Sequence, residues 1–502
     1  MRLPFPEHVP MVPVFYFAVI LCAIQQLQGT SSNFSLLAFF YIILAATGFN
    51  VAGGFTRTTG AFIFFNSVLG CIIGLCMKAY LGERADSNLA TPVLTMAVYV
   101  GGMAMMTVAA YLSRKVAPKN ALLGKLVTDA KLQTATVGSL VTGFLLYFAG
   151  FVLPGGNGSV LSALNQLNRF FPMAIILGVL NTIRRSGGTR STNLPVILAI
   201  GGLFTLGLLG YSKEAMFAPF ACWILVAASQ RYNLNRAQIV GCILATIFTF
   251  YYLVPYSQYG RTYKEESGAW NIGTSLSLLS NLGEVREQYL EAATEANDAR
   301  IQAYFDRPQG FFDRLQMISM DDALVNHTKQ FGLFGGYPII QSFENVVPHV
   351  LWPDKPTLLS GNVYAHEVGL LGEEDDTTGV SFSSTAVAYH MLGWPGIFLV
   401  APALWFLLFT VFDSLCGDIR KSPWGLLVMV LYVHAAPEGD TNSIIYMTFY
   451  SAFGIVFAAV VGAYLMPALG SVLIGPEGIA LRRGPRVRSA PNRLLVPDSS
   501  KG

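Results

Sequence analysis

Two charged residues that could handle a phosphate lie at the edge of apolar segments of this chain. Lys213 and Glu214 stand between two apolar stretches that are joined with almost no loop, so both are expected close to a membrane surface. A charge at membrane depth costs about 2.5–3.5 kcal/mol and is therefore a candidate for function. Lys213 could meet a lipid phosphate there. The alternative is a snorkelling pair that only marks the helix ends.

Two arginines and a second lysine in a long polar segment extend this set. Arg307 and Arg314 flank the start of a predicted helix, and Arg314 lies among apolar residues. Its planar fork of donors suits a diphosphate or a sugar acid equally well, and a structural salt bridge is the alternative. Lys355 lies in the run Trp352-Pro-Asp-Lys-Pro356, whose prolines fix the backbone and present the lysine rigidly. A plain turn residue is the other interpretation of Lys355.

Three further residues are candidates for proton transfer. His390 lies where the polar segment ends, and as a general base it needs a polarising partner that the sequence does not identify. Glu438 and Asp440 lie in a short polar turn between two apolar stretches. The alternatives are a packing role for His390 and a solvated turn for the two carboxylates.

The sequence lacks the signatures of several other chemistries. It contains no Walker loop, no Cys/His spacing for zinc and no Gly-x-Ser-x-Gly elbow. The first short loop, 28–33, has no carboxylate, although metal-dependent glycosyltransferases of the membrane often use one in an early outer loop. We therefore expect no metal or other cofactor, and no nucleic-acid partner.

Composition indicates which elements must position these residues. The chain is 53% hydrophobic and 12% charged, with a mean hydropathy of +0.50, whereas soluble domains are nearer a quarter charged. Apolar stretches long enough to span a membrane recur along the sequence. We expect an all-α polytopic membrane protein in a lipid bilayer, with about twelve transmembrane helices near 11–27, 34–53, 59–80, 90–112, 134–153, 169–183, 194–211, 215–230, 237–255, 394–413, 423–437 and 443–466.

The distribution of basic residues predicts how these spans are oriented. With the N-terminus in the cytoplasm, 20 of the 32 Lys and Arg residues face the cytoplasm and four lie in short outer loops. Both termini are then cytoplasmic. The chain divides into spans one to nine at 1–255, a large periplasmic loop at 256–392, spans ten to twelve at 393–466 and a basic cytoplasmic tail at 467–502.

The large loop carries structure of its own. It holds 18 of the 29 acidic residues. Apolar spacing predicts helices at 278–305 and 311–331, and a third at 338–350. We expect these helices to cap the membrane helices and not to form an independent domain.

Two motifs in this region resemble those of a known family. The run Val347-Pro-His-Val-Leu-Trp-Pro-Asp-Lys-Pro356 is followed by Tyr389-His-Met-Leu-Gly-Trp-Pro-Gly396, which opens the next span. With the late outer loop and Ser212-Lys213 near the middle, the chain resembles the Wzy-type oligosaccharide repeat-unit polymerases. Members of that family often have an acidic residue just before the aromatic, where this chain has Val387-Ala388. The base must then be another group.

The resemblance implies a glycosyltransferase of the bacterial inner membrane. A glycan on undecaprenyl diphosphate would be transferred to the sugar end of a second lipid-linked repeat unit on the periplasmic face. A chain-length regulator is a candidate partner. The alternatives are an O-antigen ligase-like transferase and a lipid-linked glycan flippase or transporter. In this interpretation, Lys213, Arg314 and Lys355 bind the diphosphate, His390, Glu438 or Asp440 supplies the base, and Arg307, Trp352 and Tyr389 position the substrate.

Overall fold

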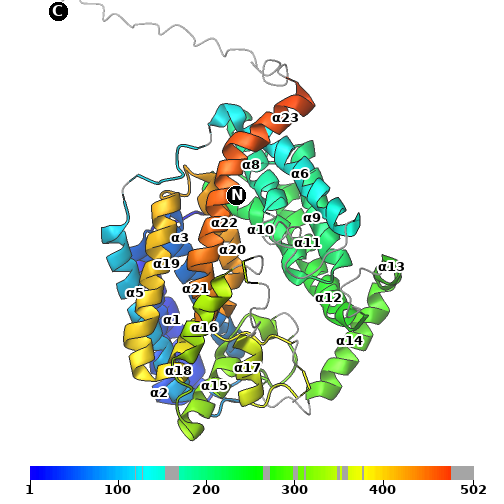
Figure 1. Cartoon of the computed structure of the whole chain (residues 1–502). Helices are drawn as coiled ribbons and strands as arrows, with labels where there is room; N and C mark the ends of the chain where they lie inside the picture. The colour runs from blue at the N-terminus through cyan, green and yellow to red at the C-terminus, as the bar shows by residue number, and fades with distance from the viewer. Residues whose placement is uncertain are drawn as a thin grey trace, which may run out of the picture.

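The described part of the chain is helical throughout. None of its residues belongs to a strand, and one isolated bridge joins Arg2 to Asn233. The expected all-α fold is therefore confirmed. The computed structural model (Figure 1) describes residues 1–118, 120–126, 128–152, 169–263, 272–297, 303–309, 312–347, 351–352, 360–372, 374–375 and 378–475.

Seven helices among these residues are long and apolar enough to cross a membrane. Two further apolar helices, α1 (Met11–Leu27) and α9 (Leu194–Leu209), are shorter. The chain is thus a multi-pass membrane protein, and the count of twelve spans stays a prediction. The seven long helices are α2 (Ser32–Ala52), Thr58–Leu81, α5 (Pro92–Val116), Asp129–Ala149, Arg236–Tyr263, Gly396–Cys416 and Thr441–Ile474.

The other three predicted spans coincide with short helices. These are α8 (Phe170–Arg185), α10 (Lys213–Ser229) and α20 (Pro423–Glu438), of 16, 17 and 16 residues. At about 1.5 Å per residue they are about 24–26 Å long, less than the hydrocarbon core of about 30 Å. In the predicted orientation, with the basic end of α8 at the cytoplasmic surface, its outer end lies within the bilayer.

The membrane helices pack in two connected groups. One group has α5 against α2 and α19 (Ala401–Cys416), and the other has α8 against α6 (Leu132–Val152), α9 and α10. Helix α20 joins them, because it contacts α10 and α8 in the second group and α19 in the first. Figure 1 shows helices α11 to α14 at one edge of the molecule: α11 (Arg236–Phe248), α12 (Val254–Gly260), α13 (Ile272–Ser280) and α14 (Leu282–Asn297).

A helical cap follows in the chain and gathers at one end of the bundle (Figure 1). Its buried residues, including Leu324 and Tyr364, belong to the same hydrophobic core as the membrane helices. The cap is thus packed onto the bundle through a shared core. Its helices are α15 (Ile318–Phe331), α16 (Tyr337–Val346), α17 (Ser360–Glu367) and α18 (Ser384–Leu392).

The loop helices differ in extent from the sequence prediction. The stretch 278–305 contains the end of α13 and all of α14, which meet near Asn281. The stretch 311–331 becomes the short turn η6 (Phe312–Arg314) and α15. Here Met317 N donates to Gly70 O at 2.7 Å. The backbone amide therefore serves a tertiary contact with a membrane helix, and α15 starts one residue later.

Two adjacent carboxylates fasten the cap to the end of α5. Asp321 Oδ2 accepts a hydrogen bond from Tyr99 OH at 2.6 Å, and its Oδ1 accepts one from Ser383 N at 2.9 Å. Asp322 accepts one from Ala90 N at 2.5 Å and three more from Thr91 N, Thr91 Oγ1 and Thr95 Oγ1. Asp322 thus holds the residues that lead into α5 and fixes the start of this helix.

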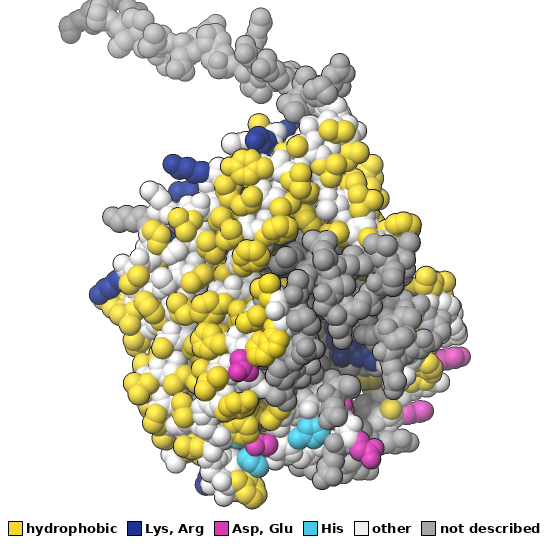
Figure 2. Space-filling model, viewed as in Figure 1, with side chains coloured by type: hydrophobic (Ala, Val, Ile, Leu, Met, Phe, Trp, Pro, Cys, Tyr) yellow, Lys and Arg dark blue, Asp and Glu magenta, His cyan; other side chains and the backbone are white. Residues whose placement is uncertain are grey.

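The surface side chains differ in charge between the bundle end and the cap end of the molecule. On the face in Figure 2, basic side chains gather mainly toward the α23 (Met466–Ile474) end, and acidic and histidine side chains gather toward the cap. Hydrophobic side chains cover most of the face between them. This pattern is the one expected of a protein with a lipid-facing belt between two polar ends.

Candidate functional site

A cavity opens between α8, α10, α20 and the helix that begins at Thr441. It holds about 660 Å³ of empty space, including space open to solvent. Polar and apolar groups share its wall. The polar groups among its lining residues are Arg169, Glu214, Tyr446, Tyr450 and Ser451. We call this space the bundle cavity.

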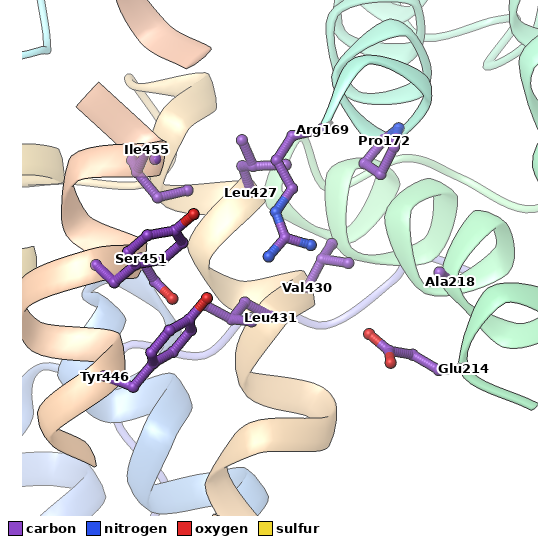
Figure 3. Close-up of a pocket in the computed structure, with 12 residues that line it drawn as sticks. Arg169, Pro172, Glu214, Ala218, Leu427, Val430, Leu431, Tyr446, Ser451 and Ile455 are labelled. Atoms are coloured by element: carbon purple, nitrogen blue, oxygen red, sulfur yellow. The ribbon is translucent and has the colours of Figure 1, made fainter. Parts of the chain in front are cut away.

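Arg169 is the cation of the bundle cavity. It immediately precedes α8, and Figure 3 shows its guanidinium pointing into the space between Tyr446 and Glu214. Among the residues that the structure describes, none forms a hydrogen bond or an ion pair with it. Five donors in a planar fork are therefore directed into the cavity, which is an arrangement suited to an oxyanion.

Two tyrosines form the opposite wall of the bundle cavity. The rings of Tyr446 and Tyr450 are stacked, with centroids 4.7 Å apart and planes inclined by 23°. Residues four apart on one helix face lie on the same side, so both hydroxyls can reach toward the cavity. They add neutral donors and acceptors next to Arg169.

The residues predicted at the outer edge of α10 lie only partly in this cavity. Ser212 caps the helix by accepting a hydrogen bond from Ala215 N at 3.3 Å, which places Lys213 and Glu214 in the first turn. Glu214 lines the cavity, and Lys213 is not among the lining residues. The predicted membrane-edge pair is therefore split, with its carboxylate facing inward.

The two carboxylates near the end of α20 have different environments. Asp440 is 7% exposed, and its Oδ1 accepts hydrogen bonds from Ser443 N at 2.7 Å and Ser443 Oγ at 2.8 Å. Its Oδ2 accepts a short hydrogen bond from Ser360 Oγ. Both oxygens are engaged in capping α21 (Thr441–Tyr446) and holding α17. This geometry assigns Asp440 a structural role.

Glu438 is the more accessible of the two. Its side chain is 32% exposed, with Oε2 3.5 Å from His434 Nδ1, and it accepts a hydrogen bond from Ser381 Oγ at 3.2 Å. It ends α20, seven residues beyond the cavity-lining Leu431, which is about 10 Å along the helix. Glu438 is thus the more exposed of the two predicted carboxylates, and it lies beyond the lining of the bundle cavity.

His390 has the partner that the sequence does not reveal. Its Nε2 lies 2.9 Å from Glu367 Oε2 and its Nδ1 lies 2.9 Å from Thr328 Oγ1. Burial, and then the neighbouring His327, lower the pKa of His390 to about 4, and burial raises the pKa of Glu367. The imidazole is therefore neutral at pH 7. At 1% exposure it is a buried positioning group whose exposed partner is Glu367.

Helix α17 connects the predicted proton-transfer residues. Its first residue, Ser360, contacts Asp440, and its last residue, Glu367, contacts His390. The eight residues of α17 span about 10 Å. The structure therefore brings His390 and the Glu438–Asp440 turn into one connected region, although not into a single site.

The remaining predicted residues lie outside the bundle cavity or outside the described structure. Arg307 and Trp352 are exposed, and Trp352 is 40% exposed. The ring of Tyr389 lies 5.5 Å from that of Trp394. Lys355 is outside the described residues, and so is the side chain of Arg314, although its backbone belongs to η6. The predicted trio of diphosphate-binding cations is therefore not tested as a set.

Sequence reasoning missed Arg169 as a site residue. It entered the prediction only as one of four basic residues in short outer loops. The rule that charges at membrane depth deserve a functional interpretation applies to Arg169 as much as to Lys213, because an apolar helix follows it directly. Applying that rule evenly would have found it.

No metal site is evident in the described part of the chain. There, no group of three or more His, Cys, Asp or Glu residues is arranged to hold a metal ion. Metal independence remains a prediction.

Comparison of the chain with protein-family models, with curated proteins and with solved structures finds no match.

Proposed function

We propose that the chain is a membrane glycosyltransferase that polymerises lipid-diphosphate-linked oligosaccharide repeat units on the outer face of the bacterial inner membrane. The observation that carries this proposal is the guanidinium of Arg169, which points into the bundle cavity without a partner among the described residues. A lipid diphosphate brings an anion to this depth, because its isoprenoid chain stays in the bilayer.

The proposed reaction is a displacement at an anomeric carbon. A hydroxyl of the acceptor sugar forms the new glycosidic C–O bond, and the C–O bond to the diphosphate breaks. The hydroxyl proton passes to Glu438, and the lipid diphosphate leaves as an anion held by Arg169. Fixed cations at the site of developing charge are the usual way to stabilise such a leaving group, and a carboxylate can serve as the base.

The motif resemblance supports the same reaction class. The segment Trp352-Pro-Asp-Lys-Pro356 follows α16, and Lys355 is a further candidate cation for the diphosphate. Undecaprenyl diphosphate is the lipid carrier that the resemblance implies, and a chain-length regulator is a candidate partner. An O-antigen ligase-like transferase would share this chemistry and differ in the acceptor.

Glycan chain length in the source organism tests the proposal. The gene is deleted and then complemented with the parent sequence or with Arg169→Ala, and Arg190→Ala, at an exposed loop arginine, serves as the matched control. We expect single repeat units in the deletion strain and with Arg169→Ala, and long chains with the parent and with Arg190→Ala. Loss of all surface glycan, single units included, would instead indicate a ligase or a flippase.

A further inference from the structure

The cap carries a second, polar hollow, separate from the bundle cavity. It lies between α15, the loop before α5 and the end of α17, and holds about 830 Å³ of empty space, including space open to solvent. We call it the cap hollow. Its polar and aromatic lining residues include Asn88, Asn326, His327, Gln330, Phe331 and Glu367.

We propose that the cap hollow binds a hydroxyl-rich, uncharged segment of a glycan. This inference rests on the proposed function, because it gives the sugars of the acceptor repeat unit a place on the protein. The chemical class follows from the groups that remain available, from the aromatic ring at the rim and from the charge of the lining.

One carboxylate that lines the cap hollow is held in a fixed orientation and can accept a hydrogen bond. Glu367 Oε2 is held by His390 Nε2 at 2.9 Å, and His390 is itself fixed by Thr328. No described residue forms a hydrogen bond or an ion pair with Glu367 Oε1, and the side chain is 30% exposed. Asp322, the other lining carboxylate, is only 3% exposed, and both of its oxygens already accept hydrogen bonds from Ala90, Thr91 or Thr95. Glu367 Oε1 is therefore the carboxylate oxygen left to accept a sugar hydroxyl.

The rim offers paired donors and acceptors. Gln330 Nε2 donates to Asn326 Oδ1 at 3.2 Å, one helical turn away on α15. This bond leaves Asn326 Nδ2 as a donor and Gln330 Oε1 as an acceptor, since each amide has both functions. A sugar hydroxyl is both donor and acceptor, so adjacent hydroxyls match this pair.

An exposed aromatic ring completes the rim. Phe331 is 75% exposed, and its ring centroid lies 4.7 Å from that of His327. The ring is therefore available to pack against a ligand at the rim. The C–H face of a pyranose can cover it and exclude water from both rings.

The charge of the cap hollow selects against acidic ligands. Two carboxylates, Asp322 and Glu367, line it, and none of its described lining residues is Lys or Arg. A uronic acid or a phosphate would meet like charge there, which is unfavourable at close range. The diphosphate and the glycan are thus assigned to different places.

Binding of free oligosaccharides tests this assignment independently of transfer. The full-length protein in nanodiscs is mixed with maltotetraose, chitotetraose or tetragalacturonate, and saturation-transfer NMR and thermophoresis measure binding. We expect at least one neutral tetrasaccharide to bind and tetragalacturonate to bind at least tenfold more weakly. Asn326→Ala/Gln330→Ala should weaken neutral binding about tenfold, because each lost hydrogen bond is worth about 0.5–1.5 kcal/mol.

Controls separate this proposal from the transfer reaction. Lys329→Gln, on the same helix but outside the cap hollow, should bind as the parent does, and so should Arg169→Ala. The assignment is overturned if no neutral tetrasaccharide binds, if the double variant binds as well as the parent, or if tetragalacturonate binds equally well. If the protein fails to transfer glycan but still binds neutral tetrasaccharides, the result counts against the proposed function and not against glycan binding in the cap hollow.

Discussion

Glu367 Oε2 lies 2.9 Å from His390 Nε2, and this contact joins the end of α17 to the helix that leads into the Gly396–Cys416 span. The rings of Phe334 and Tyr364 lie 5.3 and 5.4 Å from the His390 ring. A histidine enclosed in this way keeps its neutral form. Its role is to orient Glu367, which is the member of the pair that solvent reaches.

Acid should weaken the fold through His390. Its pKa is about 4 in the folded protein and about 6.5 when unfolded. The unfolded chain therefore binds a proton first as the pH falls below 6.5, and stability is lost between pH 6.5 and 4. Between pH 7.5 and pH 5 this amounts to about 2 kcal/mol, which the raised pKa of Glu367 partly opposes.

Thermal unfolding in detergent at pH 7.5 and pH 5 measures this loss of stability. His390→Gln removes the titrating group, so its loss of stability at pH 5 should be smaller than that of the parent. An equal loss in the parent and the variant would show that His390 does not titrate as the structure requires.

The carboxylates of the Glu438–Asp440 turn should separate into a reactive one and a structural one. Asp440→Ala should cost about 1 kcal/mol of stability, because it removes the cap of α21. Glu438→Gln should leave stability nearly unchanged and abolish glycan extension. Unfolding in detergent and the length of surface glycan give the two readouts. An active Glu438→Gln protein would exclude Glu438 as the base.

Lys78 should be essential to the contact between the Thr58–Leu81 membrane helix and the loop residues 303–309. Its side chain is fully buried, with Nζ 2.7 Å from Glu83 Oε2 and 5.0 Å from the centroid of the Tyr304 ring. Lys78→Ala leaves Glu83 without its partner, so we expect a loss of about 3–5 kcal/mol. Lys78→Met/Glu83→Gln removes both charges and should lose less.

Unfolding of the two Lys78 variants in detergent checks this prediction. Lys329→Gln, at an exposed cap lysine, is the control for loss of one positive charge and should unfold as the parent does. Equal stability of Lys78→Ala and the parent would contradict the structural role of the buried ion pair.

Hydropathy predicted the fold class well because lipid-facing helices need only apolar residues. The α-helical fold, the multi-pass character and helices at the predicted places all follow from that one requirement. The start of α15 could not be predicted, because it depends on the bond from Met317 N to Gly70 O between distant segments. The number of spans remains a prediction, since α8, α10 and α20 are short.

The site was only partly predictable, because it too depends on contacts between segments that are distant in the sequence. Lys213 and Glu214 stand out in the sequence as charges between two apolar stretches, yet only tertiary packing turns Glu214 toward Arg169. The Glu367 partner of His390 lies 23 residues away in the chain, and no periodic pattern links the two. Contacts of this kind depend on how helices pack, which residue spacing does not encode.

The most direct test of the account is transfer by purified protein in proteoliposomes that contain lipid-diphosphate-linked repeat units. We predict that the parent and Arg190→Ala lengthen the lipid-linked glycan, that Arg169→Ala does not, and that Arg169→Lys retains a small fraction of the activity. A lysine keeps the charge but loses the planar fork. Full extension by Arg169→Ala, or none by the parent protein, would contradict the account.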